Sequence, residues 1–204
     1  MRFPDIQHQD DRNELASFLR QISVGTLVTV SELQPKVGLY NYLYTDDSFY
    51  IHIGRKDEQA LQLQRNPNCQ FVFSEVLSVI PSFWIDERYG GAINNFFKYL
   101  EFDCTARFIS ETGETLKVMQ RLLDHYQATR RYDPLDTESE IYREKFAMIT
   151  MLELTVKSSR SKWNFGQAKP RAAFLNIIRQ LELRREPKDE QTALEMRKWL
   201  ERVG

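Results

Sequence analysis

Short stretches rich in β-branched and aromatic residues recur along this chain of 204 residues, and turn sequences separate them. Alternation of apolar and polar side chains over such a stretch is typical of a β-strand with one buried face. The early turns, at 31–35 and 46–48, are short enough to join antiparallel neighbours. The sequence therefore predicts six strands, most of them antiparallel, at 25–30, 36–44, 49–53, 69–74, 99–109 and 146–156.

Helical periodicity marks other segments of the chain. Asp11 and Glu14 have the spacing of a helix capping box, and apolar residues follow at helical intervals. Asp57 is a suitable cap for a short helix. The expected helices cover 11–22, 57–65, 116–126, 171–183 and 190–202. One helix before the sheet and others around the later strands predict an α+β fold, a closed or nearly closed six-stranded antiparallel β-barrel with peripheral helices.

The composition indicates an ordinary globular protein. The chain is 42% hydrophobic and 28% charged, and it holds only 8 glycines and 7 prolines, which excludes collagen-like and disordered architectures. The longest apolar run, at 146–149, is far too short for a membrane-spanning helix, and the N-terminus has no apolar core of a signal peptide. Two cysteines fit a reducing compartment. We therefore expect a soluble cytoplasmic protein with no membrane partner.

The net charge of −1 hides an uneven distribution. Residues 157–204 contain 12 basic and 6 acidic side chains, and 157–181 contains six basic and no acidic ones. Such a segment attracts an anion, which is a phosphate, a nucleic acid or an acidic face of another subunit, unless it is simply a solvated surface. We find no helix-turn-helix signature and no basic–aromatic interleaving, so we expect no nucleic acid partner.

The motifs of several enzyme classes are absent from the sequence. His8, His52 and His125 have no partner at metal-ligand spacing, and neither Cys69 nor Cys104 belongs to a CxxC pair. No GxSxG, GxGxxG or P-loop motif occurs. These absences argue against a zinc enzyme, a nucleophile-elbow hydrolase and a Rossmann dehydrogenase. We expect no metal and assign no catalytic residue.

The segment 51–57 is the strongest local feature. An expected strand leads into Gly54, two cations follow at Arg55 and Lys56, and a helix begins near Asp57. Backbone N–H groups at a helix N-terminus together with two cations form a suitable seat for a phosphate. The alternative is an ordinary strand-to-helix turn with solvated cations.

Several segments resemble known flavoproteins. Five segments resemble the nitroimidazole-resistance branch of the pyridoxamine 5′-phosphate oxidase-like flavoproteins. They are 22–30, 40–44, 48–55, 63–73 and 104–109. Residues 161–170 and 80–84 are similar instead to the PaiB-type FMN-binding regulators. The resemblance extends over about 12–180 with the segments in the correct order, and this order is its specific part.

The resemblance implies an FMN-binding split β-barrel at 1–160 and a C-terminal helical extension at 161–204. It also implies a homodimer with flavin at the subunit interface. The strand at 36–41 would lie along the isoalloxazine ring, and the turn at 52–56 would hold the phosphate. A partner segment at 163–167 would approach the flavin. The residues placed at the cofactor are Lys36, Val37, Gly38, Asn41, His52, Ile53, Gly54, Arg55, Lys56, Gln59, Trp163 and Gln167.

The chain also departs from the pattern of these families. Glu58 and Gln59 stand where the nitroimidazole-resistance branch commonly carries a basic pair, and Asp57 and Glu58 would repel a phosphate dianion. The resemblance implies an FMN-dependent oxidoreductase acting on a small molecule. Two alternatives remain open, a PaiB-like negative transcriptional regulator without turnover and a flavin-free barrel that binds another ligand such as haem.

Overall fold

The computed structural model describes residues 12–32, 34–45 and 47–203. The strands are β1 (Gly25–Ser31), β2 (Gln34–Tyr40), β3 (Leu43–Thr45), β4 (Ser48–Gly54), β5 (Asn68–Ile80), β6 (Asn94–Ile109) and β7 (Ile149–Asn164). The helices are α1 (Arg12–Gln21), α2 (Glu58–Arg65), α3 (Thr112–Tyr126), α4 (Glu140–Met148), α5 (Arg171–Arg184) and α6 (Asp189–Val203), with two 3₁₀ turns, η1 (Ser82–Trp84) and η2 (Gly90–Ala92). The expected capping residue Asp11 lies outside the described residues.

The strands form one sheet in the order β2-β1-β5-β6-β7-β4-β3. The pairs β1–β2, β1–β5, β3–β4 and β4–β7 are antiparallel. The α+β antiparallel architecture is thus as expected, with seven strands instead of six, because the strand predicted at 36–44 is divided into β2 and β3. The break occurs at Tyr42, whose buried hydroxyl donates to the carbonyls of Leu19 (2.6 Å) and Ile22 (2.8 Å) and so fixes the chain between the two strands.

The later strands differ more from the prediction. β5, β6 and β7 are all longer than the alternation suggested, and residues 146–148 belong to the end of α4 and not to the last strand. α4 has no buried residue and was not expected. Its last turn carries Phe146 and Met148, whose spacing of two imitates a strand, so alternation alone extended β7 backwards in the prediction.

The structure divides into two compact units, and β5, β6 and β7 each contribute to both. We call residues 16–73 and 101–159 the barrel unit, and the other described residues, 12–15, 74–100 and 160–203, the hairpin unit. One boundary lies at 159/160, next to the division expected from the sequence, but the hairpin unit also takes in 74–100.

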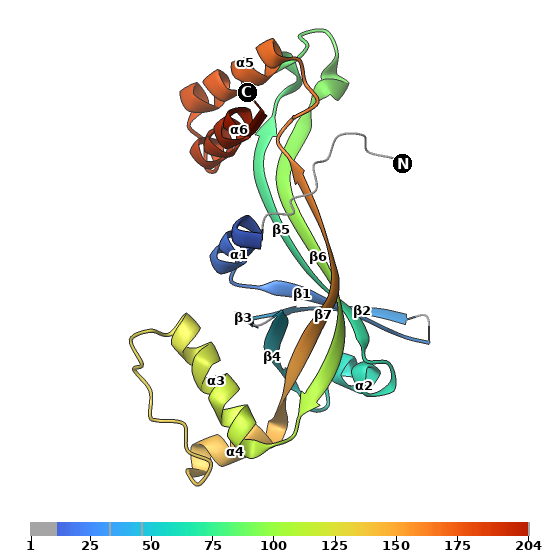
Figure 1. Cartoon of the computed structure of the whole chain (residues 1–204), viewed down its shortest axis with the longest axis vertical. Helices are drawn as coiled ribbons and strands as arrows, with labels where there is room; N and C mark the ends of the chain where they lie inside the picture. The colour runs from blue at the N-terminus through green and yellow to red at the C-terminus, as the bar shows by residue number, and fades with distance from the viewer. Residues whose placement is uncertain (1–11, 33, 46, 204) are drawn as a thin grey trace. The chain divides into compact units, whose positions relative to one another are not determined.

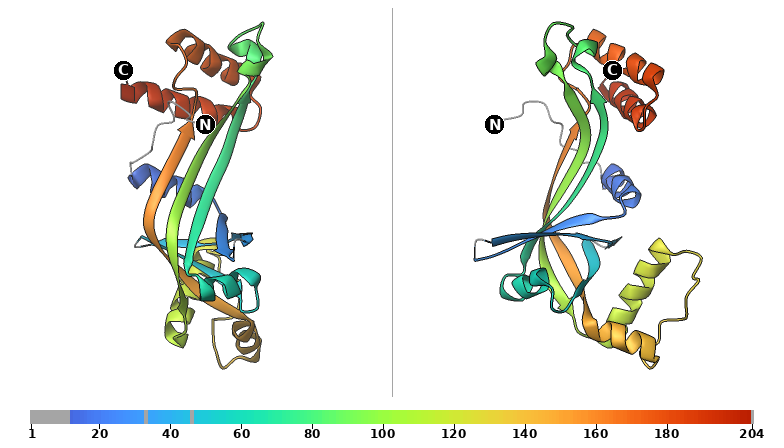
Figure 2. Two further views of the ribbon diagram at one scale, coloured as in Figure 1. Left: turned by 90° about the vertical axis from the view of Figure 1, so that its right-hand side faces the viewer. Right: turned by 180° about the vertical axis from the view of Figure 1, so that it is seen from behind.

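The core of the barrel unit is aromatic. Phe49, Phe71 and Phe73 are at most 1% exposed, and Tyr42 and Phe102 pack against them. The ring centroids of contacting pairs lie 4.8–5.9 Å apart, mostly edge to face, the geometry that aromatic quadrupoles favour. Figures 1 and 2 show α2 and α3 on opposite sides of the strands of this unit. A second apolar cluster joins α3 to the ends of β6 and β7. It consists of Ile109, Val118, Met119, Leu122 and Met151.

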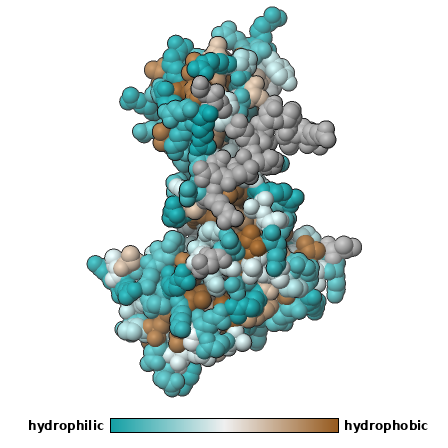
Figure 3. All heavy atoms as spheres, in the orientation of Figure 1, coloured by the Kyte–Doolittle hydropathy of each residue, from teal (hydrophilic) through white to brown (hydrophobic). Residues whose placement is uncertain are grey.

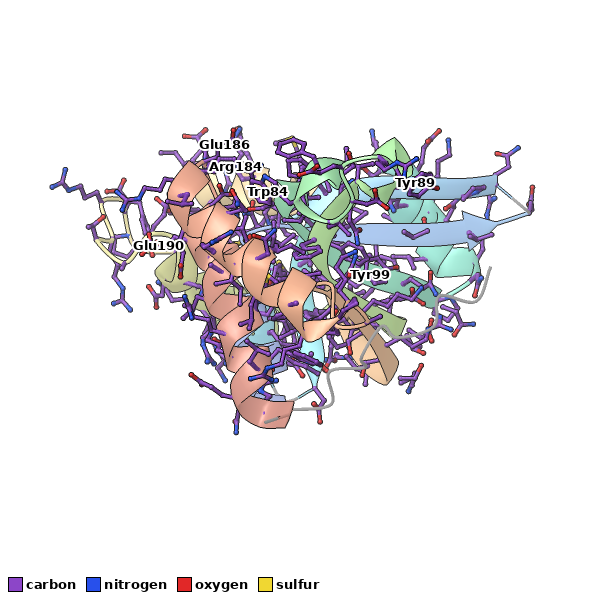
Figure 4. The ribbon with its side chains drawn as sticks, turned by 90° about the horizontal axis from the view of Figure 1, so that it is seen from above. Trp84, Tyr89, Tyr99, Arg184, Glu186 and Glu190 are labelled. Atoms are coloured by element: carbon purple, nitrogen blue, oxygen red, sulfur yellow. The ribbon has the colours of Figure 1, made fainter. Side chains whose placement is uncertain are left out.

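The hairpin unit packs α5 and α6 side by side, as Figure 1 shows at the top. Asp189, fully buried at the start of α6, accepts hydrogen bonds from Ser78 (2.6 Å) and from the Arg184 guanidinium (2.7 and 2.8 Å). The same guanidinium lies over the ring of Trp84 at 4.7 Å, and Figure 4 shows Arg184, Trp84 and Glu186 together at one end of the helices. No described helix is long and apolar enough to span a membrane.

Candidate functional site

The turn after β4 has the form that the sequence predicted. The N–H of Asp57 donates to Gly54 O at 3.0 Å, and the Asp57 carboxylate caps α2 by accepting from the N–H of Gln59 at 2.8 Å. Four consecutive charged residues, Arg55 to Glu58, are exposed on this turn. Two cations and two carboxylates therefore surround the positive end of α2.

Two glutamines hold α2 beneath the β1–β2 hairpin. The Gln59 amide donates to Leu27 O (3.1 Å) and Lys36 O (3.3 Å), and its Oε1 accepts from the Tyr40 hydroxyl (2.8 Å). Gln62, one turn further along, accepts from Thr29 at 2.6 Å. The Gln59 side chain is only 4% exposed, so it fixes the position of the turn, and any contact with a cofactor stays a prediction.

The alternation of β2 divides the residues predicted to lie along the flavin. Lys36 and Gly38 face α2, and a Cβ atom on Gly38 would lie 2.2 Å from Gln59 Oε1, so a larger residue there would displace the Gln59 side chain. Val37 projects to the other face, where it is 67% exposed, and Leu39 on the same face is 71% exposed. Asn41, beyond the strand, donates its amide to Ser23 O at 3.1 Å.

The three cations near the turn differ in their partners. Lys36 forms a 2.7 Å ion pair with Glu58. Arg55 donates its backbone N–H to Met148 O at 2.9 Å, and its guanidinium makes one long contact, 3.5 Å, with Phe146 O. The Lys56 ammonium has no hydrogen bond or ion pair within the described part of the chain. Lys56 is therefore the cation most available to a ligand at the N-terminus of α2.

Two titratable side chains border this region. Burial raises the pKa of Tyr40 to about 12, and the charge of Asp57 adds to this effect, so the phenol stays protonated at neutral pH and acts as a hydrogen-bond donor. His52 is among the exposed residues of β4, yet neighbouring atoms desolvate its ring and lower its pKa. The imidazole is therefore neutral at pH 7. Ile53, next along the strand, is 2% exposed and can offer a ligand only its backbone.

The predicted residues of the C-terminal segment lie in the other unit. Trp163 is 5% exposed, and the Lys98 ammonium lies 4.7 Å from the centroid of its ring. Gln167 donates to Trp163 O and accepts from the N–H of Phe165, both at 2.8 Å, which closes the turn after β7. Both side chains thus have packing or hydrogen-bonding roles within the hairpin unit, and a flavin contact from them stays a prediction.

The donor set around the turn fits a flavin mononucleotide. Lys56 and the N-terminus of α2 offer charge and dipole to a phosphate, and Lys36 lies on the same side of β2. Asp57 and Glu58 weaken this attraction, so Lys36, Arg55 and Lys56 together with these two carboxylates give a local charge of +1. The exposed face with Val37 and Leu39 offers apolar surface on the other side of the strand. No cluster of described His, Cys, Asp or Glu residues could hold a metal ion.

Sequence reasoning missed the residues that hold the turn in place. Thr29 and Gln62 contact each other across more than thirty residues, and no local motif signals this pair. It also missed a cavity behind Arg55, whose walls come from strand ends and helices far apart in the sequence.

Comparison with known proteins gives the family. A model of the family described as "Putative FMN-binding domain" matches residues 1–158, while the comparison with curated proteins found no match.

Among solved structures, a "putative 5-nitroimidazole antibiotic resistance protein" from Bacteroides thetaiotaomicron is 17% identical, with a TM-score of 0.59 over 79% of this chain and 93% of that one. The FAD and heme binding protein from Mycobacterium smegmatis is 15% identical, with a TM-score of 0.65 over 78% of this chain and 74% of that one. The flavocytochrome Anf3 from Azotobacter vinelandii is 12% identical, with a TM-score of 0.66 over 82% of this chain and 74% of that one.

At these identities the structural likeness shows the fold alone, and it confirms the split β-barrel with peripheral helices that the sequence predicted. The family model matches well over half of the chain. The chain therefore belongs to the family of FMN-binding domains, and its cofactor is FMN.

Proposed function

We propose that this flavoprotein is an FMN-dependent oxidoreductase of the pyridoxamine 5′-phosphate oxidase-like class that acts on a small molecule. The observation that carries the proposal is the turn between β4 and α2. It offers an exposed Lys56 with no protein partner among the described residues, directly before a capped helix N-terminus. In this arrangement the turn holds the phosphate and β2 runs beside the ring.

The chain's own residues position the cofactor. Lys56 binds the phosphate, and Gln59 keeps the turn at a fixed distance from β2 through its bonds to Leu27 and Lys36. Bound FMN supplies hydride and electron transfer. Neutral His52 and protonated Tyr40 can donate or accept a hydrogen bond but hold no charge near the site at pH 7.

We also propose that the protein is a homodimer with flavin at the subunit interface. The support is the outer face of the edge strand β2, where Val37 and Leu39 lie exposed opposite Val28 and Thr26 of β1. Figure 3 shows hydrophobic residues scattered among hydrophilic ones on the face in view. An edge strand with an exposed apolar face is a favourable surface for a second subunit.

The test of turnover uses the FMN-loaded protein under anaerobic conditions. If the protein is an oxidoreductase, a reduced nicotinamide bleaches the flavin absorbance, and a small electron acceptor such as a quinone or nitroaromatic restores it. Bleaching only by dithionite, with every nicotinamide and acceptor tried inert, would contradict the proposal.

The regulator remains the second candidate because of the acid-free basic run. Its six cations do not form one helical surface, because Lys157, Arg160 and Lys162 lie on β7, Lys169 on the following turn, and Arg171 and Arg179 on α5. A groove-binding element presents its cations together. Tight DNA binding that weakens steeply with salt, without flavin turnover, would favour the regulator over the enzyme.

A further inference from the structure

A cavity of about 100 Å³ lies in the barrel unit behind Arg55. Its walls come from the turn after β4, the end of β6, the first turns of α3, residue 137, the end of α4 and the start of β7. A single water needs roughly 10–15 Å³ on the same measure, so the cavity has room for several waters or one small polyatomic ligand.

The polar lining consists of one cation and five hydroxyl groups, without a carboxylate. The hydroxyls belong to Ser110, Thr112, Thr115, Thr137 and Thr150, and the cation is Arg55. The remaining lining side chains are apolar. A hydroxyl both donates and accepts, and a guanidinium only donates, so the set is suited to a ligand whose own atoms are acceptors. We call this space the hydroxyl cavity.

These polar groups have few partners in the protein. None of the five hydroxyls forms a hydrogen bond with another described residue, although the Thr150 residue is only 7% exposed. Arg55 has five N–H donors, yet its guanidinium makes only the one long contact with Phe146 O. Arg107 and Arg130, two of the other arginines of the barrel unit, bind carboxylates at 2.7 Å or less, whereas Arg121 makes one contact, 3.2 Å, with Thr45. Arg55, Ser110 and Thr112 are exposed, Thr115 and Thr137 are half-buried and Thr150 is buried, so the set is open to a ligand that enters from solution and can use these free donors.

The start of α3 does not supply this ligand contact through its backbone. The Glu111 carboxylate already accepts the N–H groups of Gly113 and Glu114. The side-chain hydroxyls and the guanidinium therefore supply most of the donors in the cavity.

We propose that the hydroxyl cavity binds a compact oxyanion of the phosphate type. Arg55 compensates its charge, and Thr115 and Thr150 donate hydrogen bonds from two sides. The oxyanion comes either from solution as inorganic phosphate or as the phosphate group of the cofactor. In the first case Arg55 and Lys56, adjacent in sequence, serve two different ligands.

The experiment titrates inorganic phosphate into the full-length protein at constant ionic strength and follows binding by calorimetry. We expect saturable binding by the native protein. Thr150→Val, which exchanges a hydroxyl for a methyl group, should weaken it about tenfold, and so should Thr115→Val and Arg55→Gln. Circular dichroism spectra and melting temperatures show whether the variants fold.

Two matched controls separate the cavity from general effects. Thr155→Val makes the same exchange at a half-buried position on β7 that does not line the cavity, and it should leave phosphate binding within about twofold. Lys117→Gln removes one positive charge at an exposed position on α3 that does not line the cavity, and it should also retain binding. The proposal fails if the native protein shows no saturable binding, if all three cavity variants bind like the native protein, or if Lys117→Gln loses as much as Arg55→Gln.

Flavin titrations identify the source of the oxyanion independently of the proposed function. If the FMN phosphate occupies the cavity, inorganic phosphate competes with FMN and leaves riboflavin binding unchanged. If the sites are separate, FMN binds equally well in saturating phosphate. A protein that binds phosphate in the cavity but has no flavin-dependent turnover would retain this inference and lose the proposed activity.

Discussion

Gln59 is the residue on which the geometry of the turn depends most. Its buried amide joins α2 to β1 and β2, so replacing it by Ala removes the hydrogen bonds to the carbonyls of Leu27 and Lys36. Gln59→Ala should lower the free energy of unfolding by about 1–3 kcal/mol, measured by urea unfolding. Gln64→Ala, an exposed position on the same helix, should change it by less than about 0.5 kcal/mol. Equal effects of the two variants would show that Gln59 does not hold the helix.

Asp189 gives the hairpin unit a dependence on pH. Burial alone raises its pKa, but the hydrogen bonds from Arg184, Ser78 and the N–H of Glu186 outweigh burial and lower the pKa overall. A carboxylate whose pKa is lower in the folded state stabilises the fold above the ordinary Asp value of about 4, and this stabilisation is lost as the pH falls through the folded value.

Asp189→Asn keeps the shape of the side chain but removes the charge, so we expect a loss of about 2 kcal/mol at pH 7 that shrinks toward pH 3. Urea unfolding at both pH values measures this difference. Glu190→Gln, at the neighbouring exposed position, should have little effect at either pH. A loss from Asp189→Asn that is the same at pH 3 and pH 7 would contradict the assigned role of the charge.

At the scale of elements, the β1–β2 hairpin carries the proposed subunit contact. Leu39→Lys places a charge in the exposed apolar face of β2 and should convert the dimer to a monomer in light scattering. Leu183→Lys on α5 is the matched control, because Leu183 is 70% exposed against 71% for Leu39. A native protein that is already monomeric, or a Leu39→Lys variant that stays dimeric, would exclude this face as the interface.

The sequence predicts elements well where one local pattern decides them. Asp57 and the helix after it follow from capping and periodicity, and the cationic turn follows from adjacent residues. Prediction from the sequence fails where contacts between residues far apart in the chain determine where an element begins or ends. Tyr42 ends β2 through bonds to the carbonyls of Leu19 and Ile22 at the end of α1, and α4 has no buried face that periodicity could reveal. Neither feature has a local signal.

For the whole molecule, the order of segments along the chain predicted the split-barrel fold and the FMN family, since both depend on many positions at once. The hydroxyl cavity escaped prediction because Arg55, Ser110, Thr137 and Thr150 come together only through the pairing of β4 with β7 and the placement of α3 and α4. Sites assembled from separate elements need the tertiary structure.

The central claim is that the turn before α2 holds the FMN phosphate, and a comparison of FMN with riboflavin tests it most directly. Lys56→Gln should raise the dissociation constant of FMN about tenfold, because it removes a charge-assisted contact. Glu58→Gln should lower the dissociation constant of FMN, because it removes a repelling charge and frees Lys36 from its ion pair. Riboflavin, which lacks the phosphate, should bind equally to the native protein and both variants, as measured by flavin fluorescence. Unchanged FMN binding by both variants, or an equal loss of FMN and riboflavin in Lys56→Gln, would contradict the claim.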